Sequence, residues 1–292
     1  MAKTAISAIL PYFGGKRTLA PRIVQEFGKH SAYAEICCGS LAPLMAKPRA
    51  PMEIANDLYG HVINLARVLA SSRHAELQDR LSRTLMHDAI FDEAKSWCHS
   101  QDTANSTQEV RDESVEAAYW FFVLSWMGRN GMAGTKSGNQ SIATRYTSNG
   151  GSGGFRWQQA VDSVPAWHDR LRGVHFKQMD CVQLASRLQD AKGWVIYVDP
   201  PYIRKGSKYV CDFELEDHAR LASVLQEKRE ARVVVSYYDE PELVELYPGW
   251  TKVHMPPRKG LANSRARGDA QKSAAPEVLL INGPSIATAA QA

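Results

Sequence analysis

The sequence has few cysteines, and their spacing excludes two kinds of structural site. Five cysteines occur among 292 residues, and no two of them form a C-x-x-C pair. They are Cys37, Cys38, Cys98, Cys181 and Cys211. An odd number at irregular spacing argues against a disulfide framework and against a zinc site. The pattern predicts reduced thiols, no bound metal and a cytoplasmic setting.

The sequence also lacks any apolar run long enough to cross a bilayer, and its first ten residues show no signal-peptide pattern. We therefore expect no membrane partner. Charge of one sign does not dominate either, because the formal net charge is only +4. That mild excess is compatible with a polyanionic partner but does not require one.

The composition that is present is that of a globular enzyme. Hydrophobic residues make up 44% of the chain and charged residues 23%, which is enough to bury a core. A length of 292 residues suits one large domain, or a core with a smaller inserted domain.

Short β-rich segments alternate with helical patterns over much of the chain. We expect strands at residues 32–38, 52–55, 175–179, 194–198, 232–238 and 277–281. Apolar residues at helical spacing predict helices over residues 58–70 and 215–229. Continuous apolar runs such as 195–198 are typical of strands covered on both faces. The alternation therefore predicts an α/β fold with a parallel sheet and helices on both faces.

The middle of the chain interrupts this alternation and predicts an inserted domain over residues 71–174. It is mainly helical at first and then rich in Gly, Asn, Ser and Thr over residues 127–157. We expect a polar loop or hairpin over residues 145–157, with a turn at Asn149-Gly150. Residues 1–70 and 175–284 would then form a discontinuous catalytic domain. Residues 285–292 are expected to be a frayed tail.

The strongest motif is Asp199-Pro200-Pro201-Tyr202, which directly follows the strand expected at residues 194–198. It places an acid at the carboxyl edge of the sheet, where open α/β folds bind ligands. The prolines fix the backbone and lack N–H donors, while their carbonyls remain able to accept. The alternative is a proline-rich turn in which Asp199 caps a helix.

These groups suit methyl transfer to an aromatic amine. The lone pair of the adenine N6 is delocalised into the ring, so the amine is a poor nucleophile. The Asp199 carboxylate and the Pro200 carbonyl can accept its hydrogens and direct the lone pair at a methyl donor. The Tyr202 ring offers a flat face on which a base can stack.

Further motifs occur at the expected strand ends and in an N-terminal loop. They are the loop Tyr12-Phe13-Gly14-Gly15-Lys16 before a helix expected near Thr18, the segment Glu35 to Ser40, the pair Asn56-Asp57, and Asp180. An acid after a strand can accept from a ribose hydroxyl, and Asp180 can accept from an adenine amine. Each motif alone is weak, because a strand-end acid is ordinarily a helix cap.

Together these motifs resemble the Dam-type DNA adenine-N6 methyltransferases, from Pro11 to about Asn282. The resemblance implies a Rossmann-like methyltransferase sheet, S-adenosylmethionine as cofactor and methylation of the adenine N6 in duplex DNA. It implies that Asp199, Pro200, Pro201 and Tyr202 are catalytic. The cofactor-binding residues that it implies are Tyr12, Phe13, Gly14, Gly15, Lys16, Glu35, Cys37, Gly39, Ser40, Asn56, Asp57, Asp180, Cys181 and Asp199.

The glycine-rich segment departs from the family pattern. Only Gly39 is kept, Ile36 replaces a proline, and Cys37 and Cys38 stand where Phe and a small residue are usual. Adjacent cysteines also allow a catalytic thiol, as in cytosine-C5 methyltransferases. We favour small buried cysteines under a turn, because the D-P-P-Y motif supplies acceptors and no nucleophile.

The inserted domain is similar to the family's target-recognition region at residues 129–131, 145–146 and 154–155. An adenine inside a duplex cannot reach a pocket, so the resemblance implies base flipping. Basic side chains would contact phosphates, and Arg, Asn or Gln the base edges. The expected DNA-binding residues are Arg129, Asn130, Lys136, Asn139, Gln140, Arg145, Asn149, Arg156, Arg258 and Lys259. For each of them a plain surface loop is the alternative.

Two other functions fit the same residues. One is an N-methyltransferase acting on RNA or on a protein amide, and the other is a DNA-binding protein that keeps the fold without the activity. The target sequence and any restriction partner stay open, as does the choice between a bacterium and a phage-infected host cell. We expect a monomer or a weak dimer.

Overall fold

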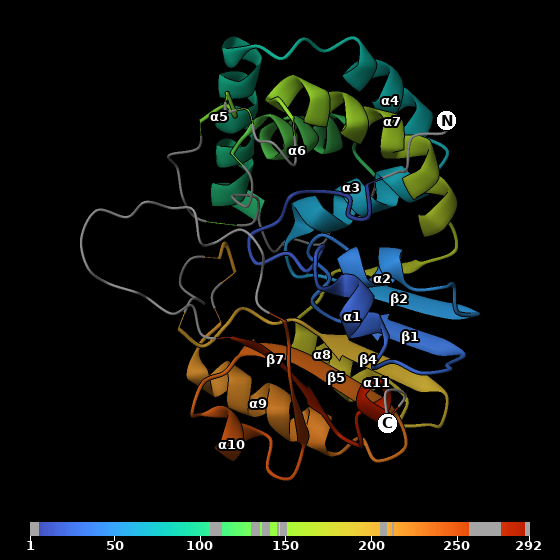
Figure 1. The fold of residues 1–292 in the computed structure, drawn as a ribbon. Coiled ribbons are helices and arrows are strands. Elements are labelled where there is room, and N and C mark those ends of the chain that lie inside the picture. The colour runs from blue at the N-terminus through green and yellow to red at the C-terminus, as the bar shows by residue number, and fades with distance from the viewer. Residues whose placement is uncertain are drawn as a thin grey trace.

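The computed structural model is a mixed α/β fold with a seven-stranded sheet. It describes residues 6–105, 113–129, 135, 141–144, 146, 151–204, 209–211, 213–256 and 276–289. Within these residues the strand order is β3-β2-β1-β4-β5-β7-β6. Figure 1 shows the sheet at one end of the molecule and a group of helices at the other. The turn expected at Asn149-Gly150 lies outside the described residues.

The strands fall close to where the apolar runs predict them. Their bounds are β1 Ala32–Glu35, β2 Met52–Asn56, β3 His175–Lys177, β4 Trp194–Val198, β5 Arg232–Tyr238, β6 Thr251–His254 and β7 Glu277–Ile281. The expected β1 was too long, because the chain turns after Glu35 toward Gly39. The sheet is parallel as expected from β3 to β5, whereas β7 pairs antiparallel with both β5 and β6 at the other edge. β6 was not predicted because it is a short, half-exposed edge strand.

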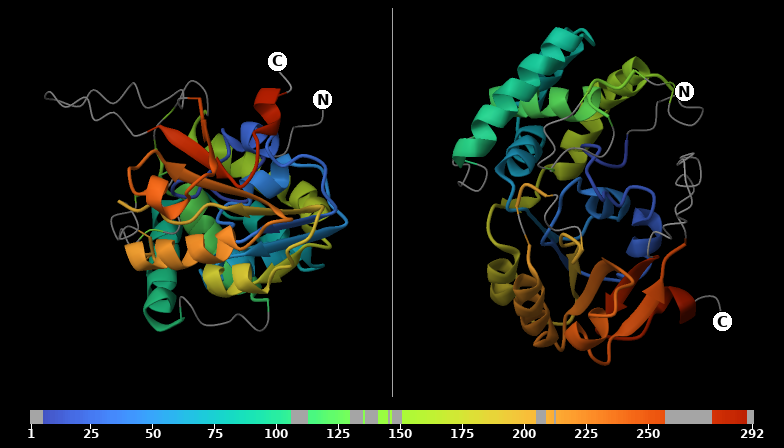
Figure 2. Two further views of the ribbon diagram at one scale, coloured as in Figure 1. Left: turned by 90° about the horizontal axis from the view of Figure 1, so that it is seen from below. Right: turned by 90° about the vertical axis from the view of Figure 1, so that its left-hand side faces the viewer.

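Helices cover both faces of the sheet. They are α1 Ala20–Val24, α2 Ala42–Ala46, α3 Gly60–Ala70, α8 Cys181–Arg187, α9 Leu215–Gln226, α10 Leu243–Leu246 and α11 Ile286–Ala289. The side chains of β4 alternate between the two faces of the sheet. Val195 and Tyr197 belong to the hydrophobic core that includes α3, whereas Ile196 belongs to the core that includes α8 and α9. All five β4 residues are buried, as expected for a strand with two covered faces. The two turned views show both layers (Figure 2).

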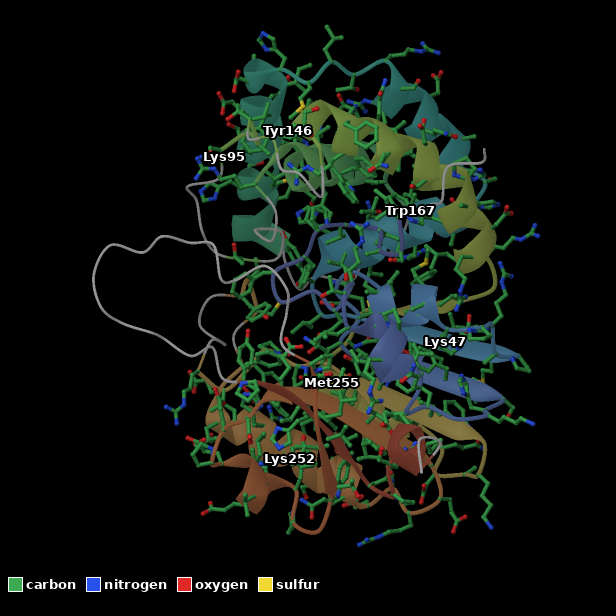
Figure 3. The ribbon with its side chains drawn as sticks, in the orientation of Figure 1. Lys47, Lys95, Tyr146, Trp167, Lys252 and Met255 are labelled. Atoms are coloured by element: carbon green, nitrogen blue, oxygen red, sulfur yellow. The ribbon has the colours of Figure 1, made fainter. Side chains whose placement is uncertain are left out.

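The remaining helices pack on one another and on α3, away from the sheet (Figure 1). They are α4 His74–Ser82, α5 Asp88–Asn105, α6 Val115–Met127 and α7 Gly153–Leu171. The fully buried Trp167 of α7 donates from Nε1 to the Ile6 carbonyl over 2.6 Å (Figure 3). The boundaries at residues 70 and 174 stay a prediction, because α3 packs against both α6 and β3.

Two sequence expectations about loops are wrong. The polar stretch ends at Gly151, because Ser152 caps α7 by accepting a hydrogen bond from the Phe155 N–H over 3.2 Å. The expected frayed tail begins as α11, because the buried Glu26 carboxylate accepts from the Ser285 hydroxyl and the Ile286 N–H, each at 2.9 Å. No helix in the described ranges is both long and apolar enough to cross a membrane.

Candidate active site

A cavity lies at the carboxyl ends of β1 to β4. It holds about 1060 Å³ of empty space, counting the solvent at its mouth. These strands are parallel and lie in the order β3-β2-β1-β4. The residues that follow them, Asp180, Asp57, Gly39 and Asp199, therefore lie at one edge of the sheet. From β1 the chain continues to β2 and β3 on one side and then crosses back to β4 on the other side of β1. Open α/β sheets bind ligands at such a switch point.

Most residues expected from the motifs line this cavity. They are Tyr12, Phe13, Gly15, Lys16, Glu35, Cys37, Gly39, Ser40, Asp57, Asp180, Cys181, Asp199 and Pro201. Four other expected residues, Gly14, Asn56, Pro200 and Tyr202, are not among its lining residues. The cavity is also lined by residues that the motifs did not predict, namely Ile36, Cys38, Pro43, Leu58, Tyr59, Tyr209, Val210, Cys211, Phe213 and Asp217. Leu58 and Tyr59 directly follow Asp57, so their position was a usable signal.

Asp199 is joined to the N-terminal loop by an ion pair. The Lys16 ammonium lies 2.7 Å from Asp199 Oδ1, and the two side chains are 3% and 19% exposed. The same ammonium donates to the Gly14 carbonyl over 3.0 Å and lies 4.8 Å from the centre of the Tyr202 ring. The Asp199 carboxylate thus opens to the cavity and accepts from the Lys16 ammonium.

Tyr202 is placed differently from the sequence expectation. Its side chain is 2% exposed, it packs edge-on against Tyr238 at 4.3 Å, and its hydroxyl donates to Glu277 over 3.4 Å. Lys16 lies over the ring. A base can stack on Tyr202 only after Lys16 moves away, so the stacking role stays a prediction.

The turn after β1 is held by Asp57. One oxygen of the Asp57 carboxylate accepts from the Gly39 N–H over 2.8 Å and the other from the Tyr59 N–H over 3.0 Å. Burial raises the pKa of Asp57, while the backbone N–H groups act in the opposite direction. Because each carboxylate oxygen has two lone pairs, Asp57 can still accept from a ligand hydroxyl.

Gly39→Ala should weaken cofactor binding by about 10-fold, because Gly39 has φ +43° and an added Cβ would lie 3.0 Å from the Tyr12 ring. Titration calorimetry with S-adenosylmethionine measures the change. Gly249→Ala is the control, since Gly249 also has positive φ and its added Cβ meets nothing within 4 Å. Equal affinity for the two variants would contradict a role for the Gly39 turn in binding.

Glu35 is a buried acid in the cavity wall. It is 1% exposed and accepts from the Tyr33 hydroxyl over 2.8 Å and the Leu44 N–H over 3.0 Å. Burial raises the pKa of Glu35 to about 8, with a further contribution from nearby Asp199. The group is therefore mostly neutral at pH 7, so Asp199 carries the negative charge beside it.

The adjacent cysteines Cys37 and Cys38 are poor nucleophiles. A hydrogen bond with Cys181, together with burial, raises the pKa of Cys37 well above its ordinary value. Burial likewise raises the pKa of Cys38. Since the thiolate is the reactive form, this environment disfavours the catalytic-thiol alternative.

Asn56 and Asp180 make structural contacts at the ends of their strands. Asn56 is 1% exposed, and its amide donates to the carbonyls of Ile36 and Met179. Asp180 caps α8 by accepting from the Gln183 N–H over 2.9 Å. The helix-cap alternative thus applies to Asp180, although the side chain also lines the cavity.

Comparison with known families identifies the family to which the chain belongs. Residues 12–259 match the family of D12 class N6 adenine-specific DNA methyltransferases. The chain belongs to this family. Adenine-N6 methylation of DNA and S-adenosylmethionine as methyl donor follow from membership, and the Dam-type resemblance is confirmed. No curated protein matches the chain.

Two solved structures of the rRNA methyltransferase aviRa from Streptomyces viridochromogenes are similar to this D12-class chain. Both are 13% identical to it. One has a TM-score of 0.36 over 90% of this chain and 82% of that chain. The other has a TM-score of 0.38 over 94% and 89%. At these values the similarity says nothing about substrate.

The cavity of the D12-class chain fits its donor. Leu58 and Phe213 offer apolar surface for a purine ring, and the acids at the strand ends can accept from hydroxyl and amine groups. Asp199 supplies negative charge for a sulfonium. Within the described part of the chain, no group of three or more His, Cys, Asp or Glu side chains is arranged to hold a metal ion.

Few of the expected DNA-binding residues can be placed. Arg129 is exposed after α6, and Arg156 lies half-buried in the first turn of α7. Asn130, Lys136, Asn139, Gln140, Arg145, Asn149, Arg258 and Lys259 lie outside the described residues. Tyr146 and Phe155, from the matching recognition motifs, are 77% and 49% exposed. Tyr146 lies at the helical end of the molecule (Figure 3).

Proposed function

We propose that this protein methylates the N6 of an adenine that has been flipped out of duplex DNA, with both the adenine and S-adenosylmethionine bound in the cavity. The observation that carries the proposal is the Asp199 carboxylate at the end of β4, which lines the cavity and accepts from the N–H groups of the Lys16 ammonium. A strand-end carboxylate that accepts from N–H groups within the cavity is suited to accept from the N–H groups of a bound amine.

The role of Asp199 follows from the chemistry of the amine. S-adenosylmethionine supplies an electrophilic methyl group on a sulfonium. The Asp199 carboxylate accepts one hydrogen of the N6 amine, which draws its lone pair out of the ring toward that methyl group. Pro200 is not among the residues that line the cavity, so its carbonyl as the acceptor of the second hydrogen stays a prediction. As the nitrogen takes the methyl group, the bond between that methyl group and the sulfonium sulfur breaks, and a neutral thioether leaves. The methylated nitrogen then carries a positive charge, and Asp199 is positioned to stabilise it and to accept its proton.

The helical part of the molecule would hold the DNA. Extrusion of a base from a duplex leaves a gap that proteins fill with an inserted side chain. Tyr146 and Phe155 suit this because both carry large aromatic rings that are exposed to solvent. Arg129, Arg156 and the other expected basic and amide residues would contact phosphates and base edges. We further propose that the protein acts as a monomer or weak dimer in a bacterium or a phage-infected host.

Transfer of a labelled methyl group tests this function. The purified protein should label adenine in duplex DNA and leave structured RNA and a protein extract unlabelled. Single-stranded DNA should be labelled more slowly, because the recognition contacts need a duplex groove. Preferential labelling of RNA or protein would replace this function with one of the two alternatives. Cofactor binding without any transfer would indicate a DNA-binding protein.

A further inference from the structure

The start of α9 has an unusual residue at a defined position. Glu214 is the N-cap and forms a capping box with Asp217. Phe213 and His218 then occupy the positions before the cap and four residues after it, where two apolar side chains usually pack as a hydrophobic staple. Their rings do pack, with centroids 4.6 Å apart at 84°. A histidine thus occupies an apolar position.

His218 is fully buried and held in one orientation. Its Nδ1 lies 2.7 Å from the hydroxyl of Tyr237, a residue of β5 that is also fully buried. Burial lowers the pKa of His218 to about 4, so the ring is neutral at pH 7. Its Nε2 has no hydrogen-bond partner among the described residues. A leucine here would pack without this unsatisfied atom, so the staple alone does not account for the imidazole.

The contacts of His218 reach the cavity on one side and the D-P-P-Y motif on the other. Phe213 lines the cavity together with Asp217 and Cys181. Tyr237 lies 6.1 Å from Tyr202, ring centre to ring centre. Phe213 shares the cavity wall with Asp180 and Cys181, which follow β3, and α9 packs on the helix α8 that begins at Cys181.

We propose that His218 is a positioning residue: through its bond to Tyr237, it fixes the ring of Phe213 as a wall for the purine of the cofactor. Tyr237 anchors the imidazole, and the imidazole sets the plane of the Phe213 ring. A purine that enters between Phe213 and the strand ends then meets a wall that is already ordered, which lowers the entropy lost on binding. The inference rests on the proposed function for the identity of the ligand.

Two single variants and their combination test whether the bond between His218 and Tyr237 supports cofactor binding. Tyr237→Phe removes only the hydroxyl, and His218→Leu keeps the staple packing but loses the bond. Each should raise both the dissociation constant and the KM for S-adenosylmethionine by about 3- to 10-fold, with kcat and the KM for DNA changed less than about 2-fold. The double variant should be no worse than either single variant, because both remove the same interaction. His218→Asn retains a polar group near Nδ1 and should recover part of the affinity.

Tyr197→Phe is the matched control, since this buried tyrosine hydroxyl bonds to Ser236 over 2.8 Å. It should leave cofactor affinity unchanged. The proposal is overturned if the His218 and Tyr237 variants lower only the melting temperature, or if their effects on affinity add. Calorimetric cofactor binding requires no DNA, so a protein that failed to methylate DNA would refute the proposed function and leave this test intact.

Discussion

Asp199→Ala is expected to lower kcat for adenine methylation by at least about 100- to 1000-fold, the loss typical when one group that stabilises a transition state is removed. The carboxylate lies at the end of β4 and opens to the cavity. Alanine cannot accept a hydrogen of the amine or stabilise the charge that forms on it. Single-turnover transfer of a labelled methyl group to duplex DNA measures the loss.

The chain offers a matched control for this variant. Asp239 also follows a strand of the sheet, β5, and also pairs with a lysine, Lys252, at 2.7 Å. It does not line the cavity. Asp239→Ala should therefore methylate at close to the normal rate. If Asp199→Ala did the same, the mechanism proposed for the strand-end acid would be wrong.

Lys16→Met should lower kcat/KM by about 10- to 100-fold, through a looser N-terminal loop and a disordered Asp199. Lys16 forms an ion pair with Asp199, donates a hydrogen bond to the Gly14 carbonyl and makes a cation–π contact with the Tyr202 ring. Methionine keeps the length and apolar stem of the side chain but loses all three contacts. Steady-state kinetics with varied cofactor and thermal unfolding together measure the effect.

Lys252→Met is the corresponding control, because it breaks the Asp239 pair at the β6 edge (Figure 3). That pair is more exposed to solvent, and such pairs contribute at most about 1 kcal/mol to stability. The control should thus change neither activity nor melting temperature appreciably. A rise in activity for Lys16→Met would mean that the ion pair with Asp199 inhibits the enzyme, opposite to the expectation here.

The parallel part of the fold and much of the site could be predicted because their signals are local. Apolar runs such as Trp194–Val198 mark central strands, and the polar residue after each run marks the ligand edge. From this rule Asp57, Asp180 and Asp199 were all expected at one edge, and all three line the cavity. The antiparallel insertion of β7 between β5 and β6 has no comparable local signal.

The missed parts of the site depend on contacts between distant segments. Tyr209 and Phe213 reach the cavity from the connection after the D-P-P-Y motif, where no hydrophobic period marks a direction. The pairing of Lys16 with Asp199, and the burial of Tyr202 behind it, likewise join segments far apart in sequence. The motifs identify Lys16, Asp199 and Tyr202, but their spacing in the sequence does not show how the three side chains lie relative to one another.

The position of β7 bears on when the enzyme can first work during its synthesis. Among the described strands, β7 leaves the ribosome after both β5 and β6, yet it lies between them in the sheet. Its first residue, Glu277, accepts from Tyr202 over 3.4 Å and lies 4.0 Å from the Lys16 ammonium. Until it inserts, β5 presents an open edge that invites mispairing. The contacts of Glu277 beside Asp199 therefore form only after β7 has been made, and a nascent chain that ends before β7 lacks an assembled catalytic centre.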